Sequence, residues 1–340
     1  MAILLIILCI ILSFTSPVFF GKENLLNILR QISTLGIIAL GMTLIIIAGE
    51  IDLSVGSGVA FSGCLLAYLW EHGIPPLVAF PLTLAGGGSI GVFTGIMRTK
   101  YRVPSFITTL ALLTGLRGAA LLITNGFSLT PFPEWYNFFG GGYILGIPLP
   151  ALLLIAVFFI MNFIMNSTTF GRSVYAVGGN AEAARLSGIN VTFVKIMVFC
   201  ITGVLVAISG IIVSSRIMSG TPTVEQGLEL DVIAAVIIGG TSLMGGSGSI
   251  VGTLIGILFI GVVANGMILL NVPVYGQFVV RGFIILLAVW LNSIQQKKYN
   301  FSLTNPVSFE NCYACDVLSF GFFYSGFFFC VWNLVLQPWS

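Results

Sequence analysis

Residues 151–160 read ALLLIAVFFI and residues 3–12 read ILLIILCIIL, and both stretches contain only apolar side chains. The strands of a membrane β-barrel would alternate polar and apolar residues, so these unbroken runs predict helices. Lipid offers a backbone no hydrogen-bond partners, and a spanning helix satisfies its own over about 20 predominantly apolar residues. The two stretches therefore predict an all-α protein that is embedded in a membrane.

The composition of the whole chain supports this class. Of 340 residues, 57% are hydrophobic and 7% are charged, whereas soluble domains carry about 25% charged residues. Thirteen basic and eleven acidic side chains cannot cover a water-soluble fold of this size. The net charge of +2 provides no basic surface for nucleic acid. The six cysteines are scattered, which is typical of packing thiols rather than of a disulfide framework.

Ten apolar runs are predicted as transmembrane helices. Lys and Arg gather in segments 98–102, 172–195 and 297–298, and the positive-inside rule places these segments in the cytoplasm. The predicted spans cross the membrane twice between the first and second basic segments and four times between the second and third. Because both numbers are even, all three segments can lie on the same side, and both ends of residues 1–298 are predicted to be cytoplasmic. The runs cover residues 2–20, 33–49, 54–70, 76–97, 104–124, 148–166, 195–215, 230–245, 250–270 and 276–292.

The same topology leaves segments 21–32, 71–75, 125–147 and 216–229 on the outer side. Segment 125–147 is rich in aromatic residues, which indicates either an interfacial aromatic belt or a docking surface for an extracellular partner. Residues 1–12 have no basic segment before them and no cleavage site after them. An uncleaved first span is therefore favoured over a signal peptide.

The inner segment 180–186, NAEAARL, predicts a short helix on the cytoplasmic surface. Asn180 is suited to the N-cap, Glu182 to the first turn and Arg185 to the end of the helix, and Gly188 stops it. A short helix with a polar face can be bound by a soluble partner protein. The alternative is a solvated loop helix that has no partner.

Two segments rich in glycine and serine interrupt apolar runs in the two halves of the chain. Broken helices inside a membrane are tolerated only where protein covers them or where they line a cavity. Paired breaks in two halves indicate a transport path. At a constant offset, Gly49, Leu53, Gly56, Ser57 and Gly58 align with Gly239, Leu243, Gly246, Ser247 and Gly248.

The first break carries two acidic residues, Glu50 and Asp52. Charges at bilayer depth indicate a functional site, although both residues can instead lie at the inner interface. For Asp52 we favour the role of N-cap for the span that begins near Ser54. Arg117 and Arg281 are candidate buried cations. The acids that they can neutralise are Glu50, Asp52, Glu229 and Asp231, and the sequence does not select the pairing.

No enzyme or metal site is predicted. The phosphate-binding pattern G-x-x-x-x-G-K-[ST] is absent, so this chain is not expected to bind ATP. His72 is the one histidine, which leaves no histidine cluster. Cys312 and Cys315 form a single C-x-x-C, which is a weak metal signal without a second pair.

Three long motifs together resemble the membrane permease subunit of ribose-type carbohydrate ABC importers. They are Gly41–Thr43 with AGEIDLSVGS at 48–57, GRSVYAVGGNAEAARLSGINV at 171–191, and ELDVIAAVIIGGTSLMGGSGSIVGTLIG at 229–256. The similarity runs from Phe19 to Lys298. It implies a type II importer-like permease in the bacterial cytoplasmic membrane, with residues 1–298 as its transmembrane domain. Two permease copies, or this chain and a close paralogue, would form the path.

The resemblance also implies partners and residue roles. A cytoplasmic subunit would bind and hydrolyse ATP, an extracytoplasmic protein would bind the sugar, and this chain would hold no cofactor. The segment that couples to the ATPase carries over to Gly178, Gly179, Asn180, Ala184, Arg185, Leu186, Ser187, Gly188 and Ile189. The predicted translocation path comprises Glu50, Asp52, Ser54, Gly56, Ser57, Asn125, Asn265 and Gln277.

The substrate stays open at this stage. Ribose is the first expectation, followed by other pentoses or hexoses, furanose-like signalling molecules and branched-chain amino acids. A competing hypothesis is a proton- or sodium-coupled carrier in which Glu50 and Asp52 bind the driving ion. A membrane scaffold that transports nothing is a third, but it does not account for paired helix breaks.

Three features depart from the family. The chain has no basic stretch before its first span, and Ser247 stands where a basic residue is common. Residues 299–340 form a Phe-rich tail that includes VLSFGFFYSGFFFCVWNLVL at Val317–Leu336. This tail is interpreted as an eleventh span, an interfacial anchor or a reading-frame artefact, and we favour the last.

Overall fold

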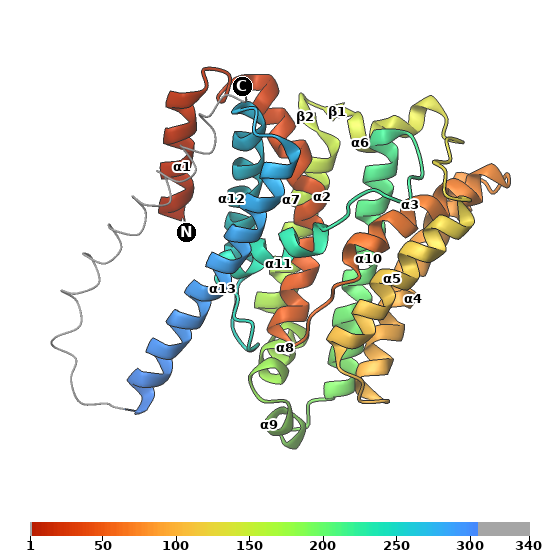
Figure 1. Ribbon diagram of the computed structural model, residues 1–340. Coiled ribbons are helices and arrows are strands. Elements are labelled where there is room, and N and C mark those ends of the chain that lie inside the picture. Colours follow the sequence, from red (N-terminus) through yellow and green to blue (C-terminus); the bar gives the residue numbers. More distant parts are fainter. Residues whose placement is uncertain (1, 305–340) are drawn as a thin grey trace.

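The structure is a computed structural model that describes residues 2–304. It is a helical bundle with one small hairpin (Figure 1). The predicted all-α membrane class is therefore confirmed. The Phe-rich stretch at Val317–Leu336 lies outside the described residues. The helices are α1 (Ala2–Thr15), α2 (Lys22–Ile47), α3 (Val55–Glu71), α4 (Pro76–Thr99), α5 (Ser105–Ile123), α6 (Phe138–Gly141), α7 (Leu149–Ser167), α8 (Thr169–Gly179), α9 (Ala181–Leu186), α10 (Val191–Ile217), α11 (Leu228–Ile238), α12 (Ile250–Leu269) and α13 (Val274–Thr304), with a 3-10 turn η1 (Glu134–Asn137) and strands β1 (Tyr143–Ile144) and β2 (Ile147–Pro148).

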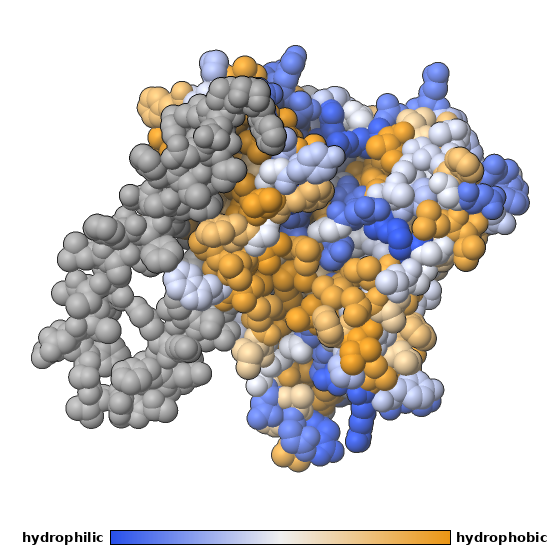
Figure 2. All heavy atoms as spheres, viewed as in Figure 1, coloured by the Kyte–Doolittle hydropathy of each residue, from blue (hydrophilic) through white to orange (hydrophobic). Residues whose placement is uncertain are grey.

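Six helices among the described residues are long and apolar enough to cross a membrane, namely α2, α4, α5, α7, α10 and α12. The remaining four predicted runs also form helices, α1, α3, α11 and α13, but these do not meet the same criterion of length and hydropathy. Figure 2 shows the corresponding surface, where a broad hydrophobic belt separates hydrophilic ends. The chain is thus polytopic, and ten crossings with cytoplasmic termini stay a prediction.

Two predicted boundaries are wrong. Residues 22–32 are not an outer loop but the first turns of α2, because Leu25, Ile28, Leu29 and Ile32 recur at helical spacing. The predicted span 230–245 is shortened to α11, which ends at Ile238, where a pair of glycines follows. Eleven residues of helix extend about 16 Å, roughly half of the hydrocarbon thickness.

The centre of the bundle is α2. Its stretch Ile37–Ile47 is almost completely excluded from solvent, and α10, α7, α11 and α12 pack around it. In contrast, α4, α5 and α7 expose most of their surface, as expected for helices that face lipid. This arrangement places both glycine-rich breaks next to the buried end of α2.

The outer segment 125–147 folds back onto the bundle. Phe132 and Tyr136 pack with Trp70 and Phe80 in an aromatic cluster. The hydroxyl of Tyr136 donates to the Ile211 carbonyl at 2.9 Å. Phe132 and Tyr136 of this segment are therefore part of the hydrophobic core and not of an interfacial belt or a docking surface. Phe127, Trp135 and Phe138 stay exposed.

Small residues bring α4 and α10 into direct backbone contact. A Cβ added at Gly91 would lie 2.2 Å from the carbonyl oxygen of Phe199, and one at Gly203 would lie 2.2 Å from that of Gly87. Lipid tails do not drive apolar helices together, so such close packing supplies much of the attraction between them. This interface attaches α4, which exposes most of its surface, to α10 in the core of the bundle.

We expect Gly91→Ala to destabilise the protein by about 1–3 kcal/mol, because the added methyl group overlaps a carbonyl of α10. Gly115 on α5 is the matched control, since a Cβ there meets nothing within 4 Å. Gly115→Ala should leave stability unchanged or raise it by about 0.5–1 kcal/mol through helix propensity. Thermal unfolding in detergent measures both, and equal shifts in the two variants would contradict the packing argument.

Candidate functional site

The predicted inner helix is confirmed as α9, which projects from one end of the bundle (Figure 1). The side-chain oxygen of Asn180 accepts hydrogen bonds from the backbone N–H groups of Glu182 and Ala183, both at 3.0 Å. Gly188 follows in the left-handed conformation, with φ +84°. The predicted cap and stop are therefore both correct.

The surface of α9 carries one ion pair and one large apolar side chain. Glu182 and Arg185 form an exposed ion pair at 2.5 Å, and the Arg185 guanidinium holds the pKa of Glu182 below its usual value. Ala184 faces the bundle and is buried, whereas Leu186 is 78% exposed. An exposed leucine among charged side chains is suited to contact with a protein partner.

Helix α8 leads from the bundle to α9. The hydroxyl of Thr168 accepts a hydrogen bond from the Gly171 N–H at 3.1 Å and so caps the start of α8. The hydroxyl of Tyr175 donates to the Gly248 carbonyl in the second break at 3.0 Å. The sequence analysis did not select Tyr175. The helix ends in two glycines, Gly178 and Gly179.

Both glycine-rich breaks meet the end of α8 at one point. The N–H of Gly246 donates to the Ile47 carbonyl, at the end of α2, over 2.8 Å. A Cβ at Gly178 would lie 1.7 Å from that same carbonyl oxygen, and one at Gly245 would lie 2.9 Å from the Cα of Gly49. We name the four residues Gly49, Gly178, Gly245 and Gly246 the glycine junction.

Only glycine fits this junction. Gly245 and Gly246 have φ values of +84° and +73°, which side chains with a Cβ rarely adopt. Gly178 has no room for a methyl group, because backbone atoms surround it. Three segments that are far apart in the sequence therefore contact each other through main-chain atoms, and the helix that carries α9 touches both breaks.

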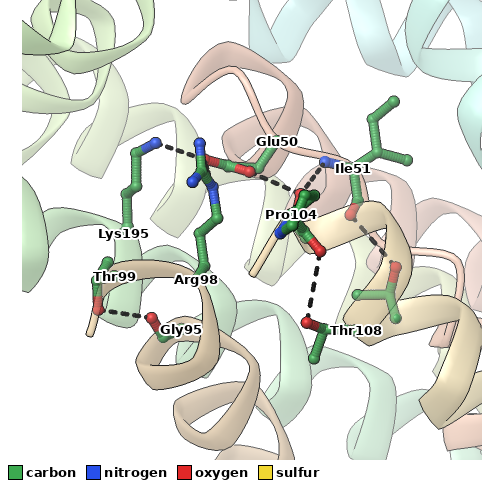
Figure 3. A network of polar contacts seen from close by, with 10 residues as sticks. Glu50, Ile51, Gly95, Arg98, Thr99, Pro104, Thr108 and Lys195 are labelled. Carbon is green, nitrogen blue, oxygen red and sulfur yellow. Dashed lines mark hydrogen bonds and ion pairs between the residues drawn. The ribbon is translucent and has the colours of Figure 1, made fainter. Parts of the chain in front are cut away.

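Glu50 lies just beyond the junction and binds three other segments (Figure 3). Its carboxylate forms ion pairs with Arg98 at 2.7 Å and with Lys195, and it accepts a hydrogen bond from the Ser105 hydroxyl at 2.6 Å. These partners come from the end of α4, the start of α10 and the start of α5. Glu50 is 5% exposed.

The partners of Glu50 were not those expected. Arg117 and Arg281 were the candidate cations, whereas Arg98 and Lys195 had been assigned only to the basic inner segments. Those segments were the available signal, because the positive-inside rule predicts them at the inner interface and Glu50 pairs with one residue from each of two of them. The pairing agrees with the alternative that places the two acidic residues at that interface, which stays a prediction.

Asp52 stabilises the start of α3, but not from the predicted position. The N-cap is Ser54, and it makes no capping hydrogen bond of its own. Instead one carboxylate oxygen of Asp52 accepts from the Ser54 N–H at 2.8 Å and from the Ser54 hydroxyl at 2.6 Å. The predicted N-cap role of Asp52 is therefore wrong, because its carboxylate binds the N-cap residue and not the N–H groups of the first turn of α3.

The two candidate buried cations are only half-buried, and they have separate partners. Arg281 pairs with Asp231 at 3.0 Å. Arg117 donates to the carbonyls of Pro222 and Val224 at 2.6 and 2.8 Å, in the segment that precedes α11.

The other predicted path residues are dispersed. Asn265 exchanges amide hydrogen bonds with Asn24 at 2.8 and 3.1 Å, which joins α12 to α2. The Gln277 side chain donates to the Val272 carbonyl at 3.0 Å, and Asn125 is exposed in the turn that follows α5. The Ser57 hydroxyl donates to the Ser54 carbonyl at 2.9 Å. Gly56 packs against the Glu229 carboxylate. The structure does not gather these residues into one site.

Apolar helices of membrane length, two broken segments and an exposed capped helix define a multi-pass membrane permease. The family model described as branched-chain amino acid transport system / permease component matches residues 24–289, and the chain belongs to this family. Like its relatives, it is a protein of the bacterial inner membrane. No solved structure matches it.

Several curated proteins are similar over most of the chain. The ribose import permease protein of Bacillus subtilis is 47% identical over 290 residues, which cover 85% of this chain and 90% of that protein. The xylose transport system permease protein of Haemophilus influenzae is 37% identical over 363 residues, with 87% and 96% covered. The L-arabinose ABC transporter permease protein of Azospirillum brasilense is 38% identical over 287 residues, with 84% and 85% covered.

We expect Glu50→Gln to lower stability by about 3 kcal/mol, because the substitution leaves Arg98 and Lys195 without their counter-charge. Thermal unfolding in detergent is the measurement. Glu182→Gln is the control, since its ion pair is fully exposed and screened by water, and no measurable change is expected. An unchanged unfolding temperature for Glu50→Gln would show that this carboxylate does not hold the helices together.

Proposed function

We propose that the chain is the membrane permease subunit of an ABC importer for a monosaccharide, ribose or a related sugar. It would act with a second permease copy or a close paralogue, a cytoplasmic ATPase and an extracytoplasmic sugar-binding protein. Both ends of residues 1–298 would lie in the cytoplasm. The observation that carries the proposal is the glycine junction, which connects the exposed helix α9 to both membrane breaks.

The coupling follows from this geometry. The ATPase would grip α9 and move it when ATP binds. The end of α8 contacts Ile47 and Gly246 through backbone atoms. A movement of α8 therefore cannot be taken up by the rotation of a side chain at this contact. The movement would therefore reach the end of α2 and the second break together, and would open the path to one side and then the other.

The comparisons support a sugar as the cargo. The relatives named above import or transport ribose, xylose and L-arabinose by their names, and all three sugars are pentoses. The family description names branched-chain amino acids, which keeps these as the alternative cargo. Specificity would reside mainly in the external binding protein.

An ion-coupled carrier is less well supported. That hypothesis needs Glu50 and Asp52 to be available to a driving ion. Glu50 is engaged by Arg98, Lys195 and Ser105, and Asp52 is engaged by Ser54. Both carboxylates therefore have structural partners close to the inner interface.

The contact with the ATPase is tested at Leu186. We expect Leu186→Asp to reduce the amount of ATPase that co-purifies with the permease by about tenfold, because an exposed apolar contact is replaced by a charge. Leu145→Asp is the control, since Leu145 is 98% exposed but lies on the predicted outer side. Equal retention of the ATPase by the two variants would contradict a docking role for α9.

Coupling is tested at the junction in proteoliposomes that contain the complete transporter. We expect Gly178→Ala to lower uptake of radiolabelled ribose and the ATPase activity stimulated by the binding protein by about tenfold. Gly179→Ala is a neighbouring control, because a Cβ there meets nothing within 4 Å, and it should keep both activities. Uptake that continues without any ATPase subunit would overturn the proposed function.

A further inference from the structure

A cavity of about 170 Å³ lies among α2, α11, α12, α13 and the segment that precedes α11. We name it the outer chamber. Its polar lining consists of Gln31, Thr34, Gln226 and four charged residues, Arg216, Glu225, Asp231 and Arg281. Because one water needs roughly 10–15 Å³ of such space, the volume holds on the order of ten waters. A molecule with about ten non-hydrogen atoms therefore fits.

The polar side of the chamber can both donate and accept hydrogen bonds. Arg281 and Asp231 are joined by one contact at 3.0 Å, which leaves further donors on the guanidinium and further lone pairs on the carboxylate. The amides of Gln31 and Gln226 add groups of both kinds. A hydroxyl group is itself donor and acceptor, so several adjacent hydroxyls match this lining.

The opposite side of the chamber is apolar. Ile32, Ile260, Met267 and Ile284 contribute hydrocarbon surface. Specific small-molecule sites combine apolar walls with a few convergent polar groups. A cyclic sugar likewise has polar and apolar parts, with hydroxyl groups at its rim and C–H groups on its faces. A free inorganic ion would use only the polar side.

The position of the chamber connects it to the breaks. Asp231 lies in the first turn of α11, and the same helix ends at Ile238, directly before Gly239 and the second break. The segment in front of α11 is held by Arg117, whose guanidinium binds the Pro222 and Val224 carbonyls. Hydrophilic atoms gather within the hydrophobic belt on the face shown in Figure 2. A polar hollow at this depth is costly in lipid and indicates a functional site.

We propose that the outer chamber is a transit site for the monosaccharide, in which the Asp231–Arg281 pair and the two glutamine amides replace part of the hydration of its hydroxyls. This inference rests on the proposed function. It adds the place where the sugar pauses, and it places this site beside α11, whose other end lies at the second break.

The first experiment fills the chamber. Ala264 lines it from α12, and Ala264→Phe should lower ribose uptake by the complete transporter in proteoliposomes by about tenfold. ATPase activity stimulated by the binding protein should stay within about twofold, because the junction is untouched. Ile268→Phe is the matched control: Ile268 lies one turn further along α12, is 51% exposed and does not line the chamber. It should retain both activities.

A second variant covers the case in which Ala264→Phe fails to assemble. Asp231→Asn combined with Arg281→Gln removes both charges of the pair together, so neither member is left without its partner, and both new side chains are no larger than the ones they replace. Ribose uptake should fall by about fivefold or more, with stimulated ATPase activity kept. Normal uptake in this double variant would overturn the transit site, as would normal uptake in an assembled Ala264→Phe transporter. Absence of ribose uptake by the wild-type transporter would instead overturn the proposed function.

Discussion

The contact on which the rest of the structure depends is the one between main-chain atoms at the glycine junction. The Gly246 N–H donates to the Ile47 carbonyl, and Gly178 packs against both groups. A contact between side chains can relax by rotation about χ angles, but a contact between backbones cannot. The end of α2, the second break and α8 are therefore fixed to one another, and α9 extends from this fixed point beyond the end of the bundle.

Ion pairs lie at both ends of the segments that flank the breaks, one of them buried and the other half-buried. At the inner end, Glu50 joins α4, α5 and α10 to the residues that follow the junction. Further out, Asp231 on α11 pairs with Arg281 on α13. Burial of an ion pair often gives no net stability, because desolvation offsets the attraction, whereas loss of one partner is costly. Such pairs specify which segments contact each other. Here Glu50 positions the first break against α4 and α10, and Asp231 positions α11, which leads to the second break, against α13.

Local patterns predicted the local structure well. The unbroken apolar runs gave helices, and Asn180 and Gly188 bounded α9 as expected, because caps and stops act within a few residues. The partners of Glu50 and of Arg117 were not predictable, because they depend on how distant helices pack. The glycine junction could not be predicted for the same reason. The sequence showed two glycine-rich breaks, but it did not show that Gly178 packs between them.

The length of α11 explains why the chain needs both Arg117 and a polar chamber. A helix of eleven residues covers about 16 Å, so α11 alone cannot cross a hydrocarbon layer of about 30 Å. The segment before it must then enter the membrane without helical hydrogen bonds, and its carbonyls need other donors. Arg117 supplies these donors to Pro222 and Val224. The same irregular segment keeps α2, α12 and α13 from closing completely, and the space that they leave is lined by its polar side chains. A short α11 therefore accounts together for the position of Arg117, for the chamber and for the glycine-rich loop that follows α11.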